Sequence, residues 1–103
     1  MSRERTDPFC RLDALDPGER ARHAELLASL RAAVDEVSER GDGFRFRLRA
    51  DPEAFARVAE WVGLERRCCP FLDFALEWRA GAAPHLDLMG EPAAKAFLAA
   101  MVR

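Results

Sequence analysis

The stretch FRFRLR, from Phe44 to Arg49, decides the fold class, because apolar and basic residues alternate through it without a break. In an extended chain its three apolar members, two phenylalanines and Leu48, fall on one side, and its three arginines fall on the other. This period of two predicts a strand with one buried face and one face in water. The segments on either side must therefore supply a core for the apolar face.

A helix is expected on each side of this strand, and the dipeptide Asp-Pro, at 16–17 and 51–52, opens both. Asp is a good N-cap, and proline suits the first helical position. After Asp16, apolar residues recur at helical spacing as far as Val37, so we expect one helix that ends at the glycine turn 41–43. The second helix should end near the cysteine pair, because Pro70 cannot extend it without cost.

Two further alternating segments, 74–78 and 85–88, are joined by a short turn and predict a hairpin. A last helix is expected after Pro92. The predicted fold is α+β, a three-stranded, mainly antiparallel sheet with helices packed on one face, in the order α-β-α-β-β-α. A chain of 103 residues suits a single domain, 1–103, with an irregular N-terminal segment, 1–15, docked on it.

Composition argues against several classes of protein. The 16 basic residues are interspersed with 18 acidic ones and give a net charge of −2, so we expect no nucleic-acid partner. No apolar run approaches the ~20 residues of a membrane span, so we expect no membrane partner. The first residues contain no apolar segment typical of a secretory signal, which predicts a cytoplasmic protein with reduced cysteines. A homodimer remains open.

The three cysteines, Cys10 and the adjacent pair Cys68-Cys69, are the candidate functional site. An odd number with two adjacent members is a poor disulfide framework and favours metal or redox chemistry. Thiolates are strong ligands for soft metals, and a helix broken by the following proline can let two neighbouring sulfurs converge on one ion. Arg66 and Arg67 precede the pair, and their charge is expected to lower the thiol pKa values.

Three sulfurs are an incomplete set for structural zinc, which prefers four ligands. His23 lies on the apolar stripe of the first helix, and Glu65 lies one helical turn before the cysteine pair, so either could be the fourth ligand. Three thiolates without a nitrogen would suit Hg(II), As(III) or Cu(I). The predicted cofactor is therefore a soft metal ion, Hg(II) or Zn(II), and the predicted metal ligands are Cys10, Cys68, Cys69, His23 and Glu65.

The stretch ERRCCPFL, from Glu65 to Leu72, together with Cys10, resembles a family of small bacterial proteins. Those proteins carry an E-R-x-C-C-P-F signature and one N-terminal cysteine, and some are associated with mercury- and heavy-metal-resistance gene neighbourhoods. The resemblance extends over nearly the whole chain, and its C-C-P-F motif is the distinctive part. It implies that this protein handles heavy metals.

Four functions are compatible with these features. The first is a cytosolic soft-metal protein that sequesters or transfers its ion through three thiolates. The second is a thiol enzyme, which uses the Cys68-Cys69 pair for redox chemistry, or for cleavage of a metal–carbon bond with Glu65 or Asp73 as the acid. The third is haem sensing at the Cys-Pro dipeptide 69–70, and the fourth is an interaction domain whose cysteines only pack. The sequence favours the first function and assigns no catalytic residue.

Overall fold

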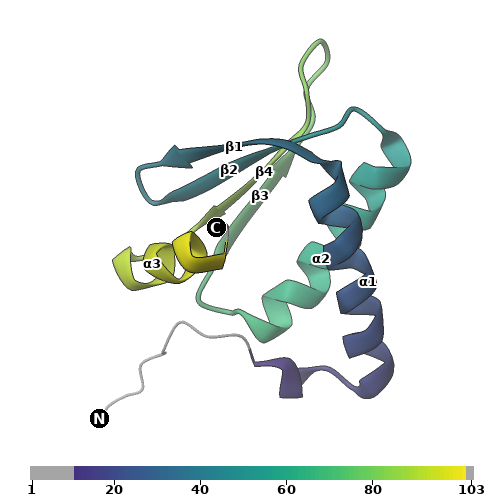
Figure 1. Ribbon diagram of the computed structural model, residues 1–103, viewed down its shortest axis with the longest axis vertical. Coiled ribbons are helices and arrows are strands. Elements are labelled where there is room, and N and C mark those ends of the chain that lie inside the picture. Colours follow the sequence, from purple (N-terminus) through teal and green to yellow (C-terminus); the bar gives the residue numbers. More distant parts are fainter. Residues whose placement is uncertain (1–10, 102–103) are drawn as a thin grey trace.

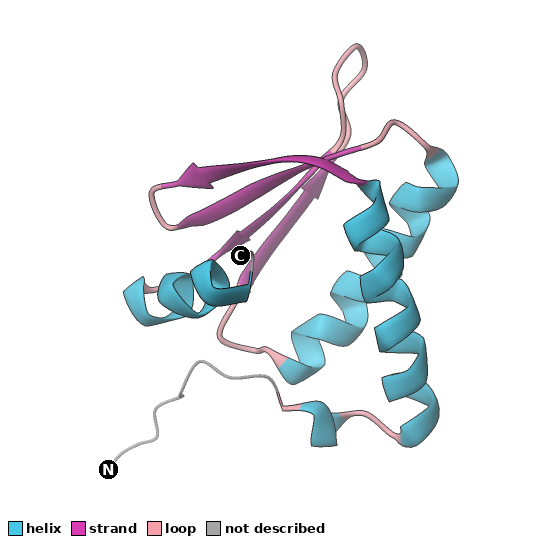
Figure 2. Cartoon of the chain, in the orientation of Figure 1, coloured by secondary structure: helices cyan, strands magenta, loops and turns pink. Residues whose placement is uncertain are grey.

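The structure is a computed structural model, and it describes residues 11–101 of the chain. Three α-helices and a four-stranded antiparallel sheet confirm the α+β class (Figures 1 and 2). None of the helices in this part of the chain is long and apolar enough to cross a membrane. The elements in order are the 3-10 helix η1 (Leu12–Ala14), α1 (Pro17–Ala33), β1 (Val34–Arg40), β2 (Gly43–Leu48), α2 (Pro52–Cys68), β3 (Asp73–Glu77), β4 (His85–Met89) and α3 (Pro92–Met101).

The sheet has the strand order β1-β2-β4-β3, and every neighbouring pair is antiparallel. The predicted hairpin is the pair β3–β4, and the FRFRLR strand, β2, joins it through β4. Apolar side chains of β2 and β4, such as Leu48 and Leu86, are buried in the core against the helices. The opposite face carries charged groups, including an ion pair between Arg45 and Asp87. Figure 1 shows the three helices on one side of the sheet.

Two details of the predicted fold are wrong, and both concern residues 34–40. The sheet has four strands rather than three, because α1 ends at Ala33 and Val34–Arg40 forms the edge strand β1. A loop of two residues, 41–42, reverses the chain, and Arg40 then pairs with Gly43. Valine spacing in this segment fits a helix, but β-branched residues also suit strands, and pairing with β2 decides between the two. The element order is consequently α-β-β-α-β-β-α.

The predicted helix boundaries at the two Asp-Pro dipeptides are confirmed. The backbone N–H of Glu19 donates to the Asp16 carboxylate at 2.8 Å, and the N–H of Asp16 donates back to the Glu19 carboxylate at 3.0 Å. Such a reciprocal pair satisfies donors that the first turn of a helix leaves unpaired. The predicted end of α2 is also confirmed, because Cys68 is its last residue and the N–H of Cys69 caps it on the Glu65 carbonyl.

The buried side of α2 is centred on Trp61. This residue is 3% exposed, whereas Ala59, two positions earlier, is exposed. Trp61 has far more apolar surface to remove from water, so its burial sets the orientation of the helix. The same orientation places the acidic side chain of Glu65 in the interior. The buried residues of α2 recur every three or four positions and are Ala54, Val58, Trp61, Glu65 and Cys68.

Candidate metal centre

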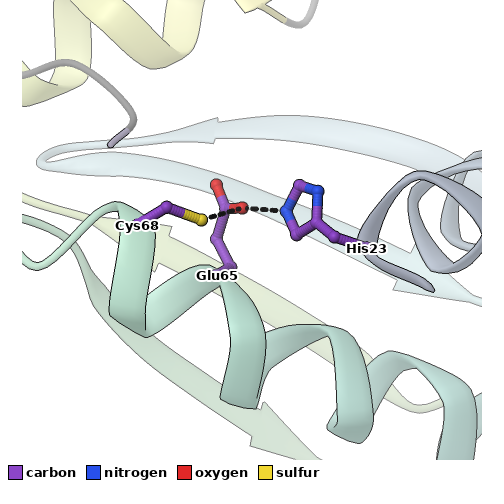
Figure 3. A group of neighbouring side chains, drawn as sticks. All are labelled: His23, Glu65 and Cys68. Atoms are coloured by element: carbon purple, nitrogen blue, oxygen red, sulfur yellow. Dashed lines mark hydrogen bonds and ion pairs between the residues drawn. The ribbon is translucent and has the colours of Figure 1, made fainter. Parts of the chain in front are cut away.

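Glu65 is the acidic residue that α2 carries into the interior, where it is 3% exposed. A buried carboxylate needs a hydrogen-bond partner or a cation. His23, which α1 directs toward α2, supplies the partner: its Nε2 lies 2.6 Å from Glu65 Oε1. The exposed fractions of the two side chains are 12% and 4%, so the pair is largely shielded from solvent. Figure 3 shows the carboxylate between the imidazole and the thiol of Cys68.

Cys68 lies one helical turn after Glu65 and has no exposed surface. It is a free thiol, and its Sγ donates to the Leu64 carbonyl at 3.4 Å. A second, longer contact of 3.8 Å joins Sγ to Glu65 Oε1. The Cys68 sulfur and the His23 imidazole therefore contact the same carboxylate oxygen, Oε1 of Glu65.

The expectation that the neighbouring arginines lower the thiol pKa is wrong for Cys68. Burial, followed by the nearby Glu65 charge, raises the pKa of this thiol from 9.0 to about 11. Arg67 opposes the rise only weakly. Its guanidinium donates to the Glu19 carboxylate at 2.7 Å and to the Ala14 carbonyl at 3.0 Å. The charge of Arg67 is thus directed at Glu19 and the Ala14 carbonyl rather than at the sulfur of Cys68.

Cys69 is the second sulfur beside Glu65, and it is also fully buried. Its Sγ lies 3.1 Å from Glu65 Oε2, the oxygen that His23 does not contact. Cys69 is disulfide-bonded in the structure, so the expectation of reduced cysteines is wrong for this residue. Its sulfur could therefore act as a thiolate ligand only after reduction.

Four of the five predicted metal ligands thus gather around one carboxylate. His23 and Cys68 lie at one oxygen of Glu65, and Cys69 lies at the other. Cys10, the fifth, lies outside the described residues, so its role stays a prediction. His23 and Glu65 are separated by 42 positions in the chain, and the packing of α1 on α2 brings their side chains into contact.

Three of these residues have the geometry of a metal-binding group. The ligand atoms of His23, Glu65 and Cys68 all lie within 4.8 Å of one another. A tetrahedral zinc ion with bonds of about 2.0–2.3 Å holds its ligand atoms roughly 3.5 Å apart, so small side-chain movements would form the site. A mixed set of nitrogen, oxygen and sulfur suits zinc, and the sulfur also suits softer ions.

Trp61 is a core residue of α2, and it lies beside the site. Its ring centroid lies 6.2 Å from that of His23. The indole Nε1 is buried without a hydrogen-bond partner among residues 11–101. The position of Trp61, four residues before Glu65 on one helix, is the sequence signal that could have indicated this proximity.

The short helix η1 is attached to the C-terminal end of α2, next to the cysteines. The backbone N–H of Arg11 donates to the Cys68 carbonyl at 2.6 Å. This bond satisfies one of the carbonyls that the last turn of a helix leaves without an internal partner.

Comparison of the chain with protein-family models, with curated proteins and with solved structures finds no match.

Proposed function

We propose that this protein binds a soft or borderline metal ion, Zn(II) or Hg(II), and sequesters or transfers it in the cytoplasm. His23, Glu65 and Cys68 would be its ligands. The observation that carries the proposal is the convergence of an imidazole, a carboxylate and a free thiol within 4.8 Å in a buried location. The resemblance of the ERRCCPFL stretch to proteins from mercury-resistance neighbourhoods supports the same class of ligand.

Charge balance supports a cation at this position. A buried carboxylate and a buried thiolate would repel each other without one, and desolvation would penalise both. A divalent ion bound to Glu65 and Cys68 would neutralise the two negative charges, and a neutral His23 would add a nitrogen ligand. The hydrogen bond between His23 and Glu65 would be replaced by two metal bonds. The Cys68 thiol would lose its proton when the sulfur binds the metal, so binding should release a proton.

The three-thiolate form of the site requires two further ligands. Reduction of Cys69 would provide a thiolate on the other side of Glu65, which it already contacts at 3.1 Å. That ligand would complete the set of four that structural zinc prefers. Cys10 would complete a set of three sulfurs for Hg(II). We therefore expect tighter binding by the reduced protein than by the oxidised one.

A thiol enzyme is the second candidate function. A free thiol, Cys68, adjoins the disulfide-bonded Cys69, and a carboxylate contacts both sulfurs. Thiol–disulfide exchange requires a thiolate, however, and burial keeps the Cys68 thiol protonated at neutral pH. A metal ion bound at the site would itself lower the pKa of this thiol, whereas the exchange reaction has no such cation. The metal-binding proposal accounts for the histidine as well, which the exchange reaction does not need.

The test is metal titration of the protein after treatment with a phosphine reductant and removal of that reductant. Native mass spectrometry should show one Zn(II) or Hg(II) per chain, and competition with a chelator should give the affinity. We expect Cys68→Ser, His23→Ala and Glu65→Gln each to weaken zinc binding by at least about tenfold, because the loss of a group that only orients a metal ligand already costs about 10- to 100-fold.

Two matched variants control for nonspecific effects. His85→Ala removes a histidine that also contacts a carboxylate, Glu77, but on the open face of the sheet. Glu60→Gln neutralises an acidic residue of the same helix as Glu65, which pairs with Arg22 at the surface. Neither should change the metal affinity. Equal affinities for the wild type and Cys68→Ser would overturn the proposal.

A further inference from the structure

A cavity of about 400 Å³ adjoins the candidate metal centre, between the two long helices, α3 and the sheet. Its wall is mainly apolar, and Arg31 and Glu65 are the charged residues in it. A larger hollow of about 570 Å³ lies near Lys95, but it contains none of the metal ligands. Lys95 there already binds Glu39 at 2.6 Å. The smaller cavity is therefore the one that adjoins a proposed metal ligand, Glu65.

Glu65 belongs to both the cavity and the metal-binding group. Its carboxylate contacts His23 at 2.6 Å, and the same residue forms part of the cavity wall. Trp61 also lines the cavity, and its buried Nε1 has no acceptor within the described part of the chain. The ring of Trp61 contributes flat apolar surface to the cavity wall, which suits a guest with an apolar or aromatic group.

We propose that the ligand of this site is an organometal cation, a soft metal ion that carries one apolar organic substituent. This inference rests on the metal-binding function proposed above. The metal would bind Cys68 beside Glu65, and the substituent would occupy the apolar cavity. An aryl group fits best, because its flat apolar ring buries more surface against this mainly apolar wall than a smaller substituent does.

The number of free thiols agrees with this ligand. A cation of this type has already formed one bond to carbon, so a single thiolate completes a two-coordinate ion. Cys68 is a free thiol at the site. The cavity volume falls in the ordinary range of small-molecule sites, about 300–1,000 Å³, so a phenyl ring can be accommodated. The bound cation keeps its metal–carbon bond, and no reaction is proposed.

The first measurement compares phenylmercury(II), methylmercury(II) and inorganic Hg(II) on the wild-type protein purified without reductant, in which Cys69 keeps its disulfide bond and Cys68 is the free thiol of the site. Each is titrated in competition with glutathione, a thiol that has no cavity. We expect the protein to prefer phenylmercury over methylmercury about tenfold more than glutathione does, because the larger substituent buries more apolar surface. The Cys68→Ser variant should lose the binding of both organometal cations.

A second measurement fills the cavity. Leu27→Trp enlarges a half-buried residue of its wall, and Val37→Trp enlarges one that is 45% exposed and so tolerates substitution. Leu76→Trp, at a half-buried strand position outside the wall, is the matched control. We expect either cavity variant to lower the phenyl preference to the glutathione value while inorganic Hg(II) binding is retained. The control should keep the preference.

The outcomes separate this inference from the metal-binding proposal. If the wild type binds inorganic Hg(II) through Cys68 but shows no phenyl preference, the organometal inference is overturned and the metal site stands. If a phenyl preference survives in both cavity variants, the cavity is not the location of the substituent, and the inference is overturned as well. If Cys68→Ser binds all three mercury species as the wild type does, both proposals fail.

Discussion

Two histidine–carboxylate pairs in this protein differ in where their helices and strands place them. His23 and Glu65 meet at 2.6 Å between α1 and α2, and their side chains are 12% and 4% exposed. His85 and Glu77 meet at 3.3 Å on the open face of the sheet, where their side chains are 17% and 41% exposed, and His85 also lies 3.8 Å from Asp87. The residue types are the same, but only the first pair lies in the interior with a free thiol beside it. Placement, rather than composition, therefore distinguishes a candidate metal centre from a surface contact.

The energetic consequence follows from desolvation. A charge pair at the surface contributes little to the free energy of unfolding, because water screens the attraction and pairing reduces the conformational entropy of both side chains. A pair in the interior is costly to form and costly to break, because removing one member leaves the other without a partner. The two pairs should therefore respond very differently to the same substitution.

The largest difference is expected for the two carboxylates. Glu65→Ala should lower the free energy of unfolding by about 3 kcal/mol, because it leaves His23 buried without its partner and opens space in the core. Glu77→Ala should have a much smaller effect, because water replaces the lost contact. Urea denaturation of the metal-free proteins would measure both. Similar losses for the two variants would show that the buried pair does not contribute as described.

The thiol beside the buried pair should also be unreactive. Because the pKa of Cys68 is raised from 9.0 to about 11, its thiolate fraction at pH 8 should be about a hundredfold lower than that of an ordinary cysteine. Burial should slow the reaction further. Alkylation by iodoacetamide, followed on the Cys68 peptide by mass spectrometry, would compare native protein with protein in denaturant. Equal rates would contradict the raised pKa.

A smaller effect is expected on the open face, at the pair between Asp87 and Arg45. Two hydrogen bonds from the Arg45 guanidinium hold the pKa of Asp87 below its usual range. The stabilisation is present above the unfolded-state pKa of about 4 and is lost as the pH falls through the folded-state value. Asp87→Asn should cost about 1 kcal/mol at pH 7.

Chemical denaturation at several pH values would test this dependence. The stability difference between the wild type and Asp87→Asn should be constant near neutrality and should shrink at acidic pH. A difference that grew as the pH fell would show that the Asp87 pKa is raised rather than lowered.

The smallest effect is expected at Arg47, on the same face. Its side chain is 50% exposed and pairs with Asp35 and Glu36, which are equally or more exposed. Arg47→Ala should leave the unfolding transition unchanged within experimental error, and added salt should not alter that result. A clear loss of stability, reversed in high salt, would mean that the surface pairs act together as a network.

Much of the fold could be predicted because local chemistry determines it. The alternation in β2 and the Asp-Pro caps at 16–17 and 51–52 specify their elements without help from distant residues. The segment 34–40 could not be assigned in this way. Its two valines are three positions apart, which fits a helical period, but β-branched residues also suit strands, and the choice depends on pairing with β2. The two-residue loop 41–42 was the available signal for a hairpin.

The site could be predicted in its members but not in its arrangement. His23, Glu65 and the cysteine pair were identified from their residue types, and the structure gathers them. Their meeting depends on how α1 packs on α2, and the rotation of α2 follows from burying Trp61. The expected lowering of the thiol pKa was wrong for the same reason. Burial, which the sequence shows only indirectly, outweighs an arginine that is bound elsewhere.

The short loop between β1 and β2 has a consequence for the order of events during folding. A hairpin closed by two residues can form in about 1–10 μs, because its strands are neighbours in the chain. Residues 23 and 65 are 42 positions apart, and their meeting requires the closure of a much longer loop. The sheet edge can therefore assemble while the thiol of Cys68 is still accessible. A metal ion present at that stage would bind the sulfur of Cys68 before His23 reaches the site. The packing of α1 on α2 would then enclose the ion.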